Sequence, residues 1–360
     1  MKKVLIGICG LGRGHLERQK NIISLLSKLD VDIAIATSEE NFDFLREIYN
    51  YKLIKVSVPF IVCNEYGVDY SASLKFLNER KVDYFKSFLS FAIEVEKYFS
   101  GKPDLVLTDY EPNVAKYSYS AGIPLICLEQ QSKFFYVDEL KIDGYSISEE
   151  KFRLNYFFPK YDFRIISSFF PIDVKNQQNV IIVPPIIKKI QRLEPKKKII
   201  VYLSPYDTEN RRLKQILEPL CRIPGYSIHI YSSLGKLHSN HKNICFSSFS
   251  ESFDKDISDA EIIIATSGHQ LISEAVSLNV PMLLMPLKTY EQNYNLEMVK
   301  KYKLGEKIMF FDENEIESFL QNKQAYIKSI IGFKKKYWRL SWEEMVKSVL
   351  VNRYNFTEKQ

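Results

Sequence analysis

The residues best suited to chemistry lie in a short turn between an apolar run and a helical pattern in the second half of the chain. The run at 260–265 (AEIIIA) leads into Thr266-Ser267-Gly268, and Glu274 falls in the second turn of the helical pattern that follows. Free amides at a helix start and the positive end of its dipole suit a diphosphate. Gly268 permits close backbone approach, and the carboxylate of Glu274 is able to accept hydrogen bonds from a ribose diol. This turn therefore predicts a nucleotide-sugar pocket.

Two more side chains are placed near the same phosphate position. Ser204 follows the strand expected at 199–203, where it either contacts phosphate or is an ordinary turn residue. His269 falls in the first turn of the helix, and its protonated form would offset charge on a leaving group.

A second glycine-rich turn, Gly10-Leu11-Gly12-Arg13-Gly14-His15, follows the first apolar run and opens a helix. A dinucleotide fingerprint needs glycine at the sixth position and a lone acidic residue after the second strand. Both are missing here, which argues against a nicotinamide site. Asp109 ends the strand expected at 104–108. Because the carboxyl ends of parallel strands line the crevice of an open α/β sheet, we expect Asp109 and His15 to meet there.

The stretch 266–295 resembles the donor-binding half of GT-B glycosyltransferases. The nearest likeness is to the nucleotide-sugar transferases that include the peptidoglycan N-acetylglucosaminyltransferase and the UDP-glycosyltransferases. Their motif of Ser-Gly, Ser-Glu, Gly-x-Pro and acid-Gln…Asn is matched in order by Ser267-Gly268, Ser273-Glu274, Val280-Pro281 and Glu291-Gln292…Asn295. Asn279 stands where the family usually has glycine, and asparagine is the next best residue for a left-handed helix end. His269 replaces a glycine or alanine of many relatives.

The resemblance implies further donor contacts. Glu291 and Gln292 match the pair that hydrogen-bonds sugar hydroxyls in the family, and Asn295 is a weaker candidate. An exposed helix start explains these three residues without any ligand. Phe249 lies where relatives hold the nucleobase, although core packing explains a phenylalanine equally well.

The same resemblance gives roles to the N-terminal loop. A glycine-rich loop ending in Gly-His occupies this place in the family, which implies that Gly12 and Gly14 border the donor and that His15 is the general base. A purely positioning helix-terminus histidine is the alternative. Asp109 would orient His15. Glu111, in a stretch that resembles a less-studied branch of these enzymes, is its rival, and both carboxylates also suit turns or helix caps.

The implied function is an inverting, metal-independent glycosyltransferase without a cofactor, which moves a sugar from a nucleotide donor, expected to be UDP-linked, to a hydroxyl of a glycan, lipid-linked or small-molecule acceptor. A UDP-N-acetylglucosamine 2-epimerase on the same fold, and a non-catalytic subunit that binds nucleotide sugar or glycan, remain alternatives. The metal motif of GT-A enzymes, DxD, occurs at 30–32 and 254–256, and we expect solvated turns at both.

The elements that position these residues alternate. Short apolar runs separated by helical patterns predict an α/β protein of two Rossmann-like domains with parallel sheets facing across a cleft. We expect an N-terminal acceptor domain at 1–183, a donor domain at 184–330, and C-terminal helices at 331–360 that return to the first domain. Residues 129–165 are expected to be largely irregular, and the last strand is expected at 307–311.

Composition fits a globular protein: of 360 residues, 46% are hydrophobic and 26% charged, and the net charge is +6. Five scattered cysteines without a CxxC pair favour the reducing cytoplasm and no structural metal. No motif indicates nucleic acid binding. Basic and aromatic residues alternate at 80–98 and 333–342, which predicts either amphipathic helices on a core or peripheral contact with an anionic membrane.

Overall fold

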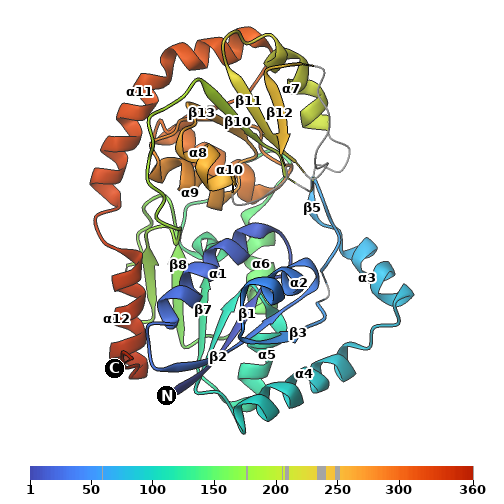
Figure 1. Ribbon diagram of the computed structural model, residues 1–360. Coiled ribbons are helices and arrows are strands. Elements are labelled where there is room, and N and C mark those ends of the chain that lie inside the picture. The colour runs from blue at the N-terminus through green and yellow to red at the C-terminus, as the bar shows by residue number, and fades with distance from the viewer. Residues whose placement is uncertain are drawn as a thin grey trace.

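The computed structural model describes residues 1–58, 60–175, 177–204, 206, 211–232, 241–247 and 252–359. Two parallel sheets, each flanked by helices, form two lobes that lie one above the other in Figure 1. The strand order of the first sheet is β3-β2-β1-β6-β7-β8-β9. Its strands are β1 (Lys2–Ile8), β2 (Val31–Thr37), β3 (Lys52–Lys55), β6 (Leu105–Asp109), β7 (Leu125–Glu129), β8 (Phe163–Ser167) and β9 (Val180–Val183).

The second sheet has the order β12-β11-β10-β13-β14-β15 among the described residues. Its strands are β10 (Lys198–Tyr202), β11 (Ser227–Tyr231), β12 (Ile244–Ser247), β13 (Ile262–Ala265), β14 (Met282–Leu284) and β15 (Gly305–Lys307). In each sheet the strand order reverses at the first strand of the lobe, between β1 and β6 and between β10 and β13. Each lobe therefore has a topological switch point, the place at which open α/β sheets bind ligands.

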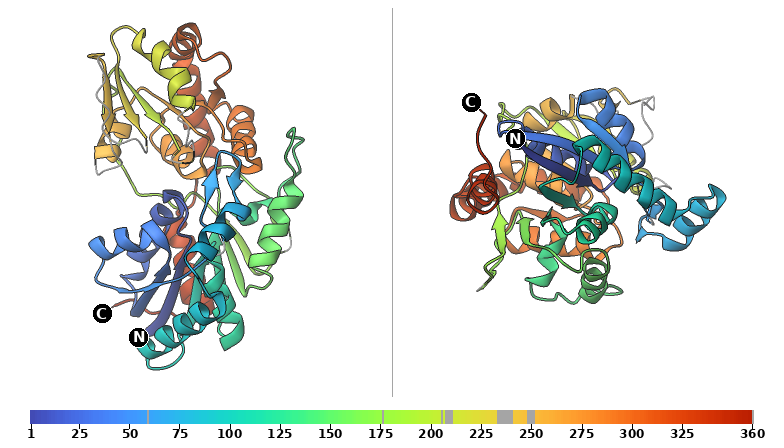
Figure 2. Two further views of the ribbon diagram at one scale, coloured as in Figure 1. Left: turned by 90° about the vertical axis from the view of Figure 1, so that its right-hand side faces the viewer. Right: turned by 90° about the horizontal axis from the view of Figure 1, so that it is seen from below.

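Helices join the strands and cover both faces of each sheet (Figures 1 and 2). In the first lobe they are α1 (Arg13–Leu26), α2 (Glu39–Ile48), α3 (Tyr70–Glu79), α4 (Tyr84–Phe99), α5 (Pro112–Ala121), the 3-10 helix η1 (Gln131–Phe135) and α6 (Ile147–Phe157). The second lobe has α7 (Arg211–Cys221), α8 (Ser252–Ser258), α9 (His269–Ser277), α10 (Tyr290–Lys301) and most of α11 (Glu313–Tyr337), and α12 (Trp342–Tyr354) follows.

Alternating side chains of the apolar strands explain why both faces must be covered. On β1, Val4 and Ile6 belong to one core cluster, whereas Leu5 belongs to the cluster on the opposite face. On β13, Ile262 and Ile263 are divided between two clusters in the same way. Because successive strand residues point to opposite faces, an uninterrupted apolar run requires helices on both sides.

Helix α12 crosses back from the second lobe and completes the core of the first, as expected. Trp342, Val346 and Leu350 of this helix are buried in the same cluster as Val4 and Ile6 of β1. Figure 1 shows α12 alongside the first sheet, close to the N-terminus of the chain. The predicted division after residue 330 falls inside α11, which continues without a break to Tyr337.

Two element predictions were wrong. The stretch expected to be irregular contains the eleven-residue helix α6. Its capping residue Ser146 accepts a hydrogen bond from the amide of Ser148, but the helix has exposed aromatic side chains, including Phe152 and Tyr156, that blur its periodicity. The last strand lies at 305–307 rather than at 307–311. Gly305 is needed there because a Cβ would lie 2.1 Å from the carbonyl oxygen of Met282 on β14.

A small hairpin of the first lobe reaches the second lobe. It consists of β4 (Cys63–Asn64) and β5 (Gly67–Val68). The amide of Lys288, just before α10, donates to the carbonyl oxygen of Glu65 at 2.8 Å, and the Lys288 Nζ lies 3.2 Å from a carboxylate oxygen of the same glutamate. The lobes are therefore joined by polar contacts as well as by the chain connections.

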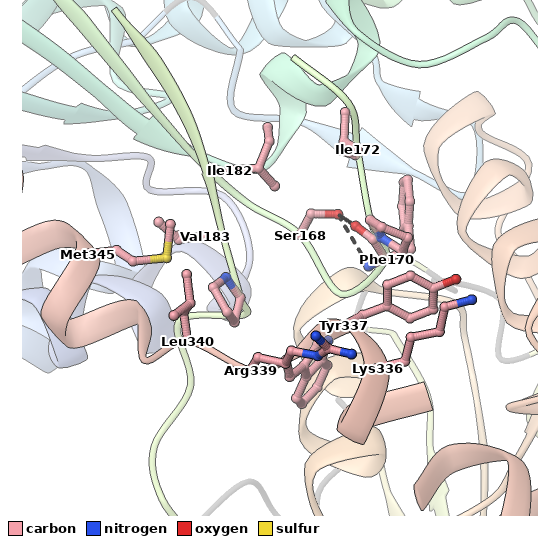
Figure 3. A pocket seen from close by; sticks show the side chains of 13 residues that line it. Ser168, Phe170, Ile172, Ile182, Val183, Lys336, Tyr337, Arg339, Leu340 and Met345 are labelled. Atoms are coloured by element: carbon pink, nitrogen blue, oxygen red, sulfur yellow. Dashed lines mark hydrogen bonds between the residues drawn. The ribbon is translucent and has the colours of Figure 1, made fainter. Parts of the chain in front are cut away.

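A cavity of about 470 Å³ lies where the chain passes between the lobes (Figure 3). Ser168 and Phe170 line it from the connection between β8 and β9. Tyr337 lines it from the end of α11, and Arg339 from the connection to α12. None of the predicted site residues contributes to its walls. No helix among the described residues combines the length and the apolar character that a bilayer crossing requires.

Candidate functional site

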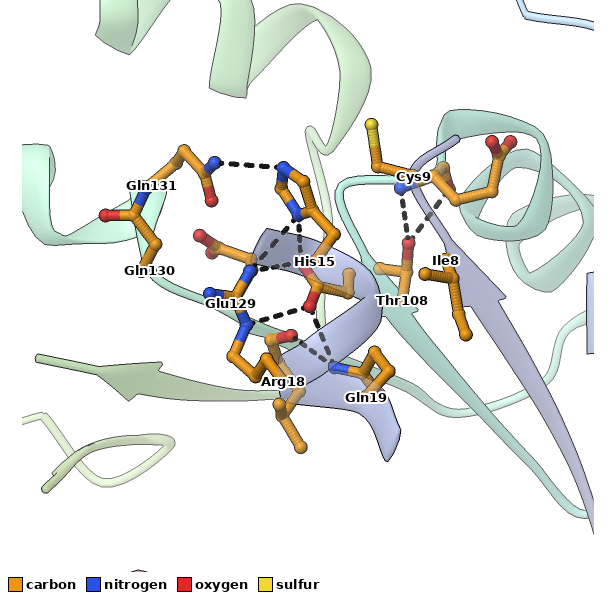
Figure 4. Close-up of polar contacts among 12 residues, drawn as sticks. Ile8, Cys9, His15, Arg18, Gln19, Thr108, Glu129, Gln130 and Gln131 are labelled. Atoms are coloured by element: carbon orange, nitrogen blue, oxygen red, sulfur yellow. Dashed lines mark hydrogen bonds and ion pairs between the residues drawn. The ribbon is translucent and has the colours of Figure 1, made fainter. Parts of the chain in front are cut away.

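The structure brings His15 and Asp109 together at the edge of the first sheet. Asp109 is the last residue of β6 and pairs with Ile8, the last residue of the neighbouring β1. His15 lies in the first turn of α1, which begins five residues after β1 ends. The Nδ1 of His15 lies 2.6 Å from Oδ1 of Asp109 (Figure 4). The meeting of these side chains at a strand end thus follows from the parallel sheet, as expected.

Asp109 is held from three directions. Arg18, one turn further along α1, donates from its Nε and a terminal nitrogen to the two carboxylate oxygens, both at 2.8 Å. Gln19 adds a third donor at 2.9 Å. Burial alone would raise the pKa of Asp109, but the charges of Arg18 and His15 and their hydrogen bonds lower it to about 2. Asp109 is therefore ionised at neutral pH and fixed in orientation.

This arrangement selects the tautomer of His15. A 2.6 Å contact with an ionised carboxylate requires the proton on Nδ1, because two acceptors would repel each other at that distance. The terminal nitrogen of Arg18 that lies 3.1 Å from Nδ1 is also a donor and so provides no alternative proton acceptor. The Nε2 of neutral His15 consequently keeps its lone pair. The side-chain amide nitrogen of Gln131 lies 3.4 Å from this Nε2.

Glu111, the rival carboxylate, has a different place. Its side chain caps α5 by accepting a hydrogen bond from the amide of Asn113 at 2.8 Å. Burial raises its pKa to about 8, although the contact with Asn113 opposes this. Within the described residues no hydrogen bond joins Glu111 to His15, so the geometry favours Asp109 as the partner of the histidine.

The predicted phosphate turn lies between β13 and α9. Gly268 is the N-cap of α9, and no side chain caps the amides of the first turn. A Cβ on Gly268 would meet no described atom within 4 Å. In contrast, α5 and α10 are capped by the side chains of Glu111 and Thr289. The start of α9 therefore has the unpaired donors and open approach that bind anions at helix N-termini.

Residues of α10 brace this turn. The Oε1 of Gln292 accepts hydrogen bonds from the amides of Ser267 at 3.1 Å and Leu287 at 2.8 Å. The hydroxyl of Ser267 donates to the backbone carbonyl oxygen of Gln292 at 2.8 Å. The Nδ2 of Asn295 donates to the backbone carbonyl oxygen of Ser267 at 3.0 Å. Gln292 and Asn295 thus shape the turn. The predicted sugar contact of Gln292 is limited to its amide nitrogen while its carbonyl oxygen is engaged in this way.

The N-terminal loop lies against the donor turn. A Cβ on Gly14 would lie 3.6 Å from the Cβ of Gln270 in the first turn of α9. A side chain is disfavoured at Gly12 for two reasons. Its φ of 71° lies in the left-handed region, and a Cβ would lie 3.1 Å from the hydroxyl oxygen of Tyr206. Ser204, at the end of β10, accepts a hydrogen bond from the amide of Tyr206 at 3.2 Å. The two glycines and Ser204 are thereby brought to the junction of the lobes.

Glu274 lies one turn into α9, half-buried beside α1. Gln270 donates to its carboxylate at 2.9 Å. Burial raises the pKa of Glu274 to about 7, with a further contribution from the nearby Glu17. A ligand that donates hydroxyl hydrogen bonds would restore the charged form. Helix α9 ends as the sequence predicts, since Asn279 adopts the left-handed conformation with a φ of 57°.

The expectation of a protonated His269 was wrong. This side chain is buried, and its Nε2 accepts a hydrogen bond from the amide of Phe169 at 3.3 Å. Burial, together with the charges of Lys133 and Arg18, lowers its pKa well below the usual value. His269 is neutral and attaches the donor turn to the first lobe. Phe249, the predicted nucleobase contact, lies outside the described residues.

The prediction of solvated turns at the two DxD segments holds only for Asp30, which lies in a partly exposed bend before β2. Asp32 lies in β2, and Asp254 and Asp256 lie in α8. Asp256 forms an ion pair with Lys198 at 2.7 Å, so its charge is already compensated.

The segment at the end of β7 contributes polar residues to the candidate site that the sequence analysis did not single out. Gln130 donates to Glu291 of α10 at 2.7 Å, and the Nζ of Lys133 donates to Oδ1 of Asn295 at 3.2 Å. Burial lowers the pKa of Lys133 to about 8, while Glu291 opposes this shift. The available signal was the position of a polar run: Glu129-Gln130-Gln131-Ser132-Lys133 begins at the last residue of the buried strand β7. The sequence analysis did not single out Arg18 and Gln19 either.

Comparison with known proteins identifies the family. The family model described as glycosyl transferase family 1 matches residues 2–323, which is most of the chain. The chain belongs to glycosyl transferase family 1. No curated protein sequence matches it.

Solved structures of GT-B glycosyltransferases have the same fold as this glycosyl transferase family 1 member. The kitacinnamycin glycotransferase has a TM-score of 0.68 at 13% identity, covering 98% of both chains. The spinosyn rhamnosyltransferase SpnG complexed with thymidine diphosphate has a TM-score of 0.64 at 11% identity, covering 97% of this chain and 100% of its own. MurG of Acinetobacter baumannii has a TM-score of 0.59 at 14% identity, covering 96% and 98%. At these identities the likeness establishes the GT-B fold.

Proposed function

We propose that this GT-B glycosyltransferase is an inverting, metal-independent enzyme that transfers a sugar from a UDP-linked donor to an acceptor hydroxyl. The observation that carries the proposal is the 2.6 Å contact of His15 with Asp109, because His15 lies in the first turn of α1, which approaches the uncapped start of α9. A base, whose Nε2 is contacted in this structure only by the amide of Gln131 among the described residues, and an anion site are thus adjacent, one from each lobe.

In the proposed reaction, Nε2 of His15 takes the proton of the acceptor hydroxyl while Nδ1 stays bonded to Asp109. The acceptor oxygen attacks the anomeric carbon, and the bond from that carbon to the phosphate oxygen breaks. A single displacement from the opposite face inverts the anomeric configuration. The proton ends on His15, where the ionised Asp109 stabilises the imidazolium.

The leaving diphosphate would be stabilised by amides at the start of α9, which need no reorganisation during the reaction. The positive end of the α9 dipole and the nearby buried Lys133 add favourable charge. Glu274 would accept hydrogen bonds from the ribose, and Glu291 would contact the donor sugar. Glu291 is bonded to Gln130 here, so sugar binding at this carboxylate requires that bond to be exchanged.

Donor identity is tested with a panel of UDP-, TDP- and GDP-sugars. Thermal stabilisation grows with ligand concentration over affinity, so the true donor should raise the melting temperature most. Nucleotide release with and without acceptors then separates transfer from epimerisation, which requires no acceptor. The anomeric configuration of the product is read by NMR spectroscopy. Retention of configuration would contradict the single displacement, and the absence of stabilisation by every nucleotide sugar would contradict the donor site.

The anion site is tested separately with Gly268→Ala. The backbone of Gly268 has φ −68° and ψ 135°, which any residue adopts, so the fold should tolerate alanine. The methyl group would stand where the diphosphate approaches, and we expect the donor KM to rise about tenfold, or about 1.4 kcal/mol. Gly332→Ala on α11, where a Cβ also meets no described atom within 4 Å, is the matched control and should leave KM unchanged. Equal KM values for the two variants would remove the support for this anion site.

A further inference from the structure

The cavity between the lobe connections has no role in the proposed reaction (Figure 3). Its volume of about 470 Å³ lies within the range of roughly 300–1,000 Å³ that is typical of small-molecule sites. Its walls come from residues between 168 and 172, from 182–184 at the end of β9, and from 336–340 together with Met345. None of these residues belongs to the catalytic pair or to the turn before α9, so this cavity is a separate site.

One end of the cavity is apolar. Val183 of β9, Leu340 after α11 and Met345 of α12 line this end with carbon and sulfur atoms (Figure 3). Leu340 is 62% exposed. Because the removal of apolar surface from water is favourable, a hydrocarbon chain is the group that this end is suited to bind.

The other end of the cavity is cationic. Lys336 and Arg339 line it beside the ring of Tyr337 (Figure 3). The Nε of Arg339 donates to the carbonyl oxygen of Lys335 at 3.4 Å, and the Nζ of Lys336 lies 5.0 Å from the centre of the Tyr337 ring. Within the described ranges neither cation forms an ion pair with a carboxylate. The negative end of α11 accounts for a lysine in its last turn, but Arg339 lies beyond that helix.

We propose that this cavity binds an alkyl phosphate, which is an amphiphile with one hydrocarbon chain and a phosphate headgroup. The chain lies along Val183, Leu340 and Met345, and the headgroup lies between Lys336 and Arg339. A phosphate monoester carries about 1.5–2 negative charges at neutral pH, which matches two cations, and its oxygens accept the paired N–H groups of a guanidinium. A sugar would leave the apolar end unfilled. This inference does not depend on the transferase function proposed above.

The test measures binding to the full chain by isothermal titration calorimetry at neutral pH. The probes are decyl phosphate, octyl phosphate, inorganic phosphate and decyltrimethylammonium, each below its critical micelle concentration. We expect the Kd of decyl phosphate to be about five- to tenfold lower than that of octyl phosphate, because two further methylenes leave water. Inorganic phosphate and decyltrimethylammonium should each bind at least about tenfold more weakly than decyl phosphate. No binding of decyl phosphate, no gain with chain length, or equal affinity for the cationic probe would overturn the proposal.

The double variant Lys336→Gln/Arg339→Gln assigns the headgroup contact. Both side chains are exposed, so the fold should tolerate the change, and the Kd of decyl phosphate should rise about tenfold. Lys328→Gln/Lys335→Gln removes the same charge from exposed positions of α11 that do not line the cavity. This matched control should keep the wild-type Kd. Equal Kd values for the two double variants, with equal melting temperatures, would refute the assignment.

An alkyl phosphate also suits the proposed anion site before α9, so the location of the ligand is tested separately. Trp338 lines the cavity, and Trp342, the other of the two tryptophans of the chain, is buried. Decyl phosphate should shift the tryptophan fluorescence to shorter wavelength in the wild type and in Gly268→Ala alike. A loss of binding confined to Gly268→Ala would place the ligand at the diphosphate site and overturn this proposal, while the transferase function would stand.

Discussion

A histidine contacts an aspartate in each lobe, and these two pairs differ in nearly every respect that matters for catalysis. His15 lies beyond the end of a strand and contacts Asp109 at 2.6 Å. His229 lies inside β11 and contacts Asp256 of α8 at 3.1 Å. Parallel strands direct their carboxyl ends, not their middles, toward the ligand crevice. Position in the sheet therefore separates a candidate catalytic pair from a structural one.

The partners of the two aspartates reinforce this difference. Asp109 receives the planar fork of Arg18, which fixes both carboxylate oxygens. Asp256 is shared by the Nζ of Lys198 and the hydroxyl of Tyr231, so His229 is one of several neighbours. A carboxylate that is already divided among structural partners has little capacity to orient a base. The following predictions test whether the two pairs are as different as this geometry implies.

The largest difference is expected between His15→Ala and His229→Ala. Loss of a general base typically lowers turnover by about 10²–10⁴-fold, whereas loss of a histidine inside β11 should change kcat by less than about threefold. Steady-state kcat and the donor-induced thermal shift are measured for both variants. Donor binding should survive in both. Equal kcat values would erase the functional distinction between the two pairs.

The second difference concerns stability in Asp109→Asn and Asp256→Asn. Removing the charge of Asp109 leaves Arg18 buried without a full partner, which costs about 3–5 kcal/mol. Replacing the partly exposed Asp256 should lower the free energy of unfolding by about 1 kcal/mol or less. Urea unfolding at pH 7 measures both values. If Asp109→Asn lowers the free energy of unfolding less than Asp256→Asn does, burial does not determine how much each pair contributes to stability.

The third prediction concerns acid. The pKa of Asp109 is lowered to about 2 in the folded protein, so its stabilisation is present above the unfolded value near 3.8 and is lost as pH falls through about 2. The loss amounts to about 2 kcal/mol. Urea unfolding of the wild type and of Asp109→Asn is repeated from pH 5 to pH 2. The difference between their free energies of unfolding should decrease by this amount. A difference that stays constant with pH would refute the lowered pKa.

The smallest effect is expected from exchanging the cations. Arg18→Lys keeps the charge but loses the two parallel hydrogen bonds that hold Asp109, and we expect kcat to fall about tenfold. Lys198→Arg is the counterpart beside Asp256 and should leave kcat within about twofold. If Arg18→Lys is also neutral, charge alone holds Asp109, and the geometric part of the comparison fails.

The sequence predicted the parts of this molecule that depend on local pattern. Apolar runs gave the parallel strands, and the strand ends placed Asp109 beside the loop of His15. The left-handed Asn279 follows from the backbone demands of a helix end. These features need only a few neighbouring residues and the geometry of a parallel sheet.

The sequence did not predict what depends on contacts between the lobes. Gln130 and Lys133 acquire their roles only because α10 of the second lobe lies against them. The position of His269 in the sequence predicts a phosphate contact. In the folded protein, however, its Nε2 accepts a hydrogen bond from the amide of Phe169, which holds the side chain in its neutral form. The helix α6 was missed because its exposed aromatic residues obscure the amphipathic pattern.

The return of α12 has a consequence for synthesis of the chain. Residues of β1 share a core with Trp342 and Leu350, and the amide of Asp30 is bonded to the carbonyl oxygen of Thr357. The ribosome releases the first lobe long before these partners exist. The lobe that emerges first therefore keeps an open apolar face until residues 342–357 have left the exit tunnel.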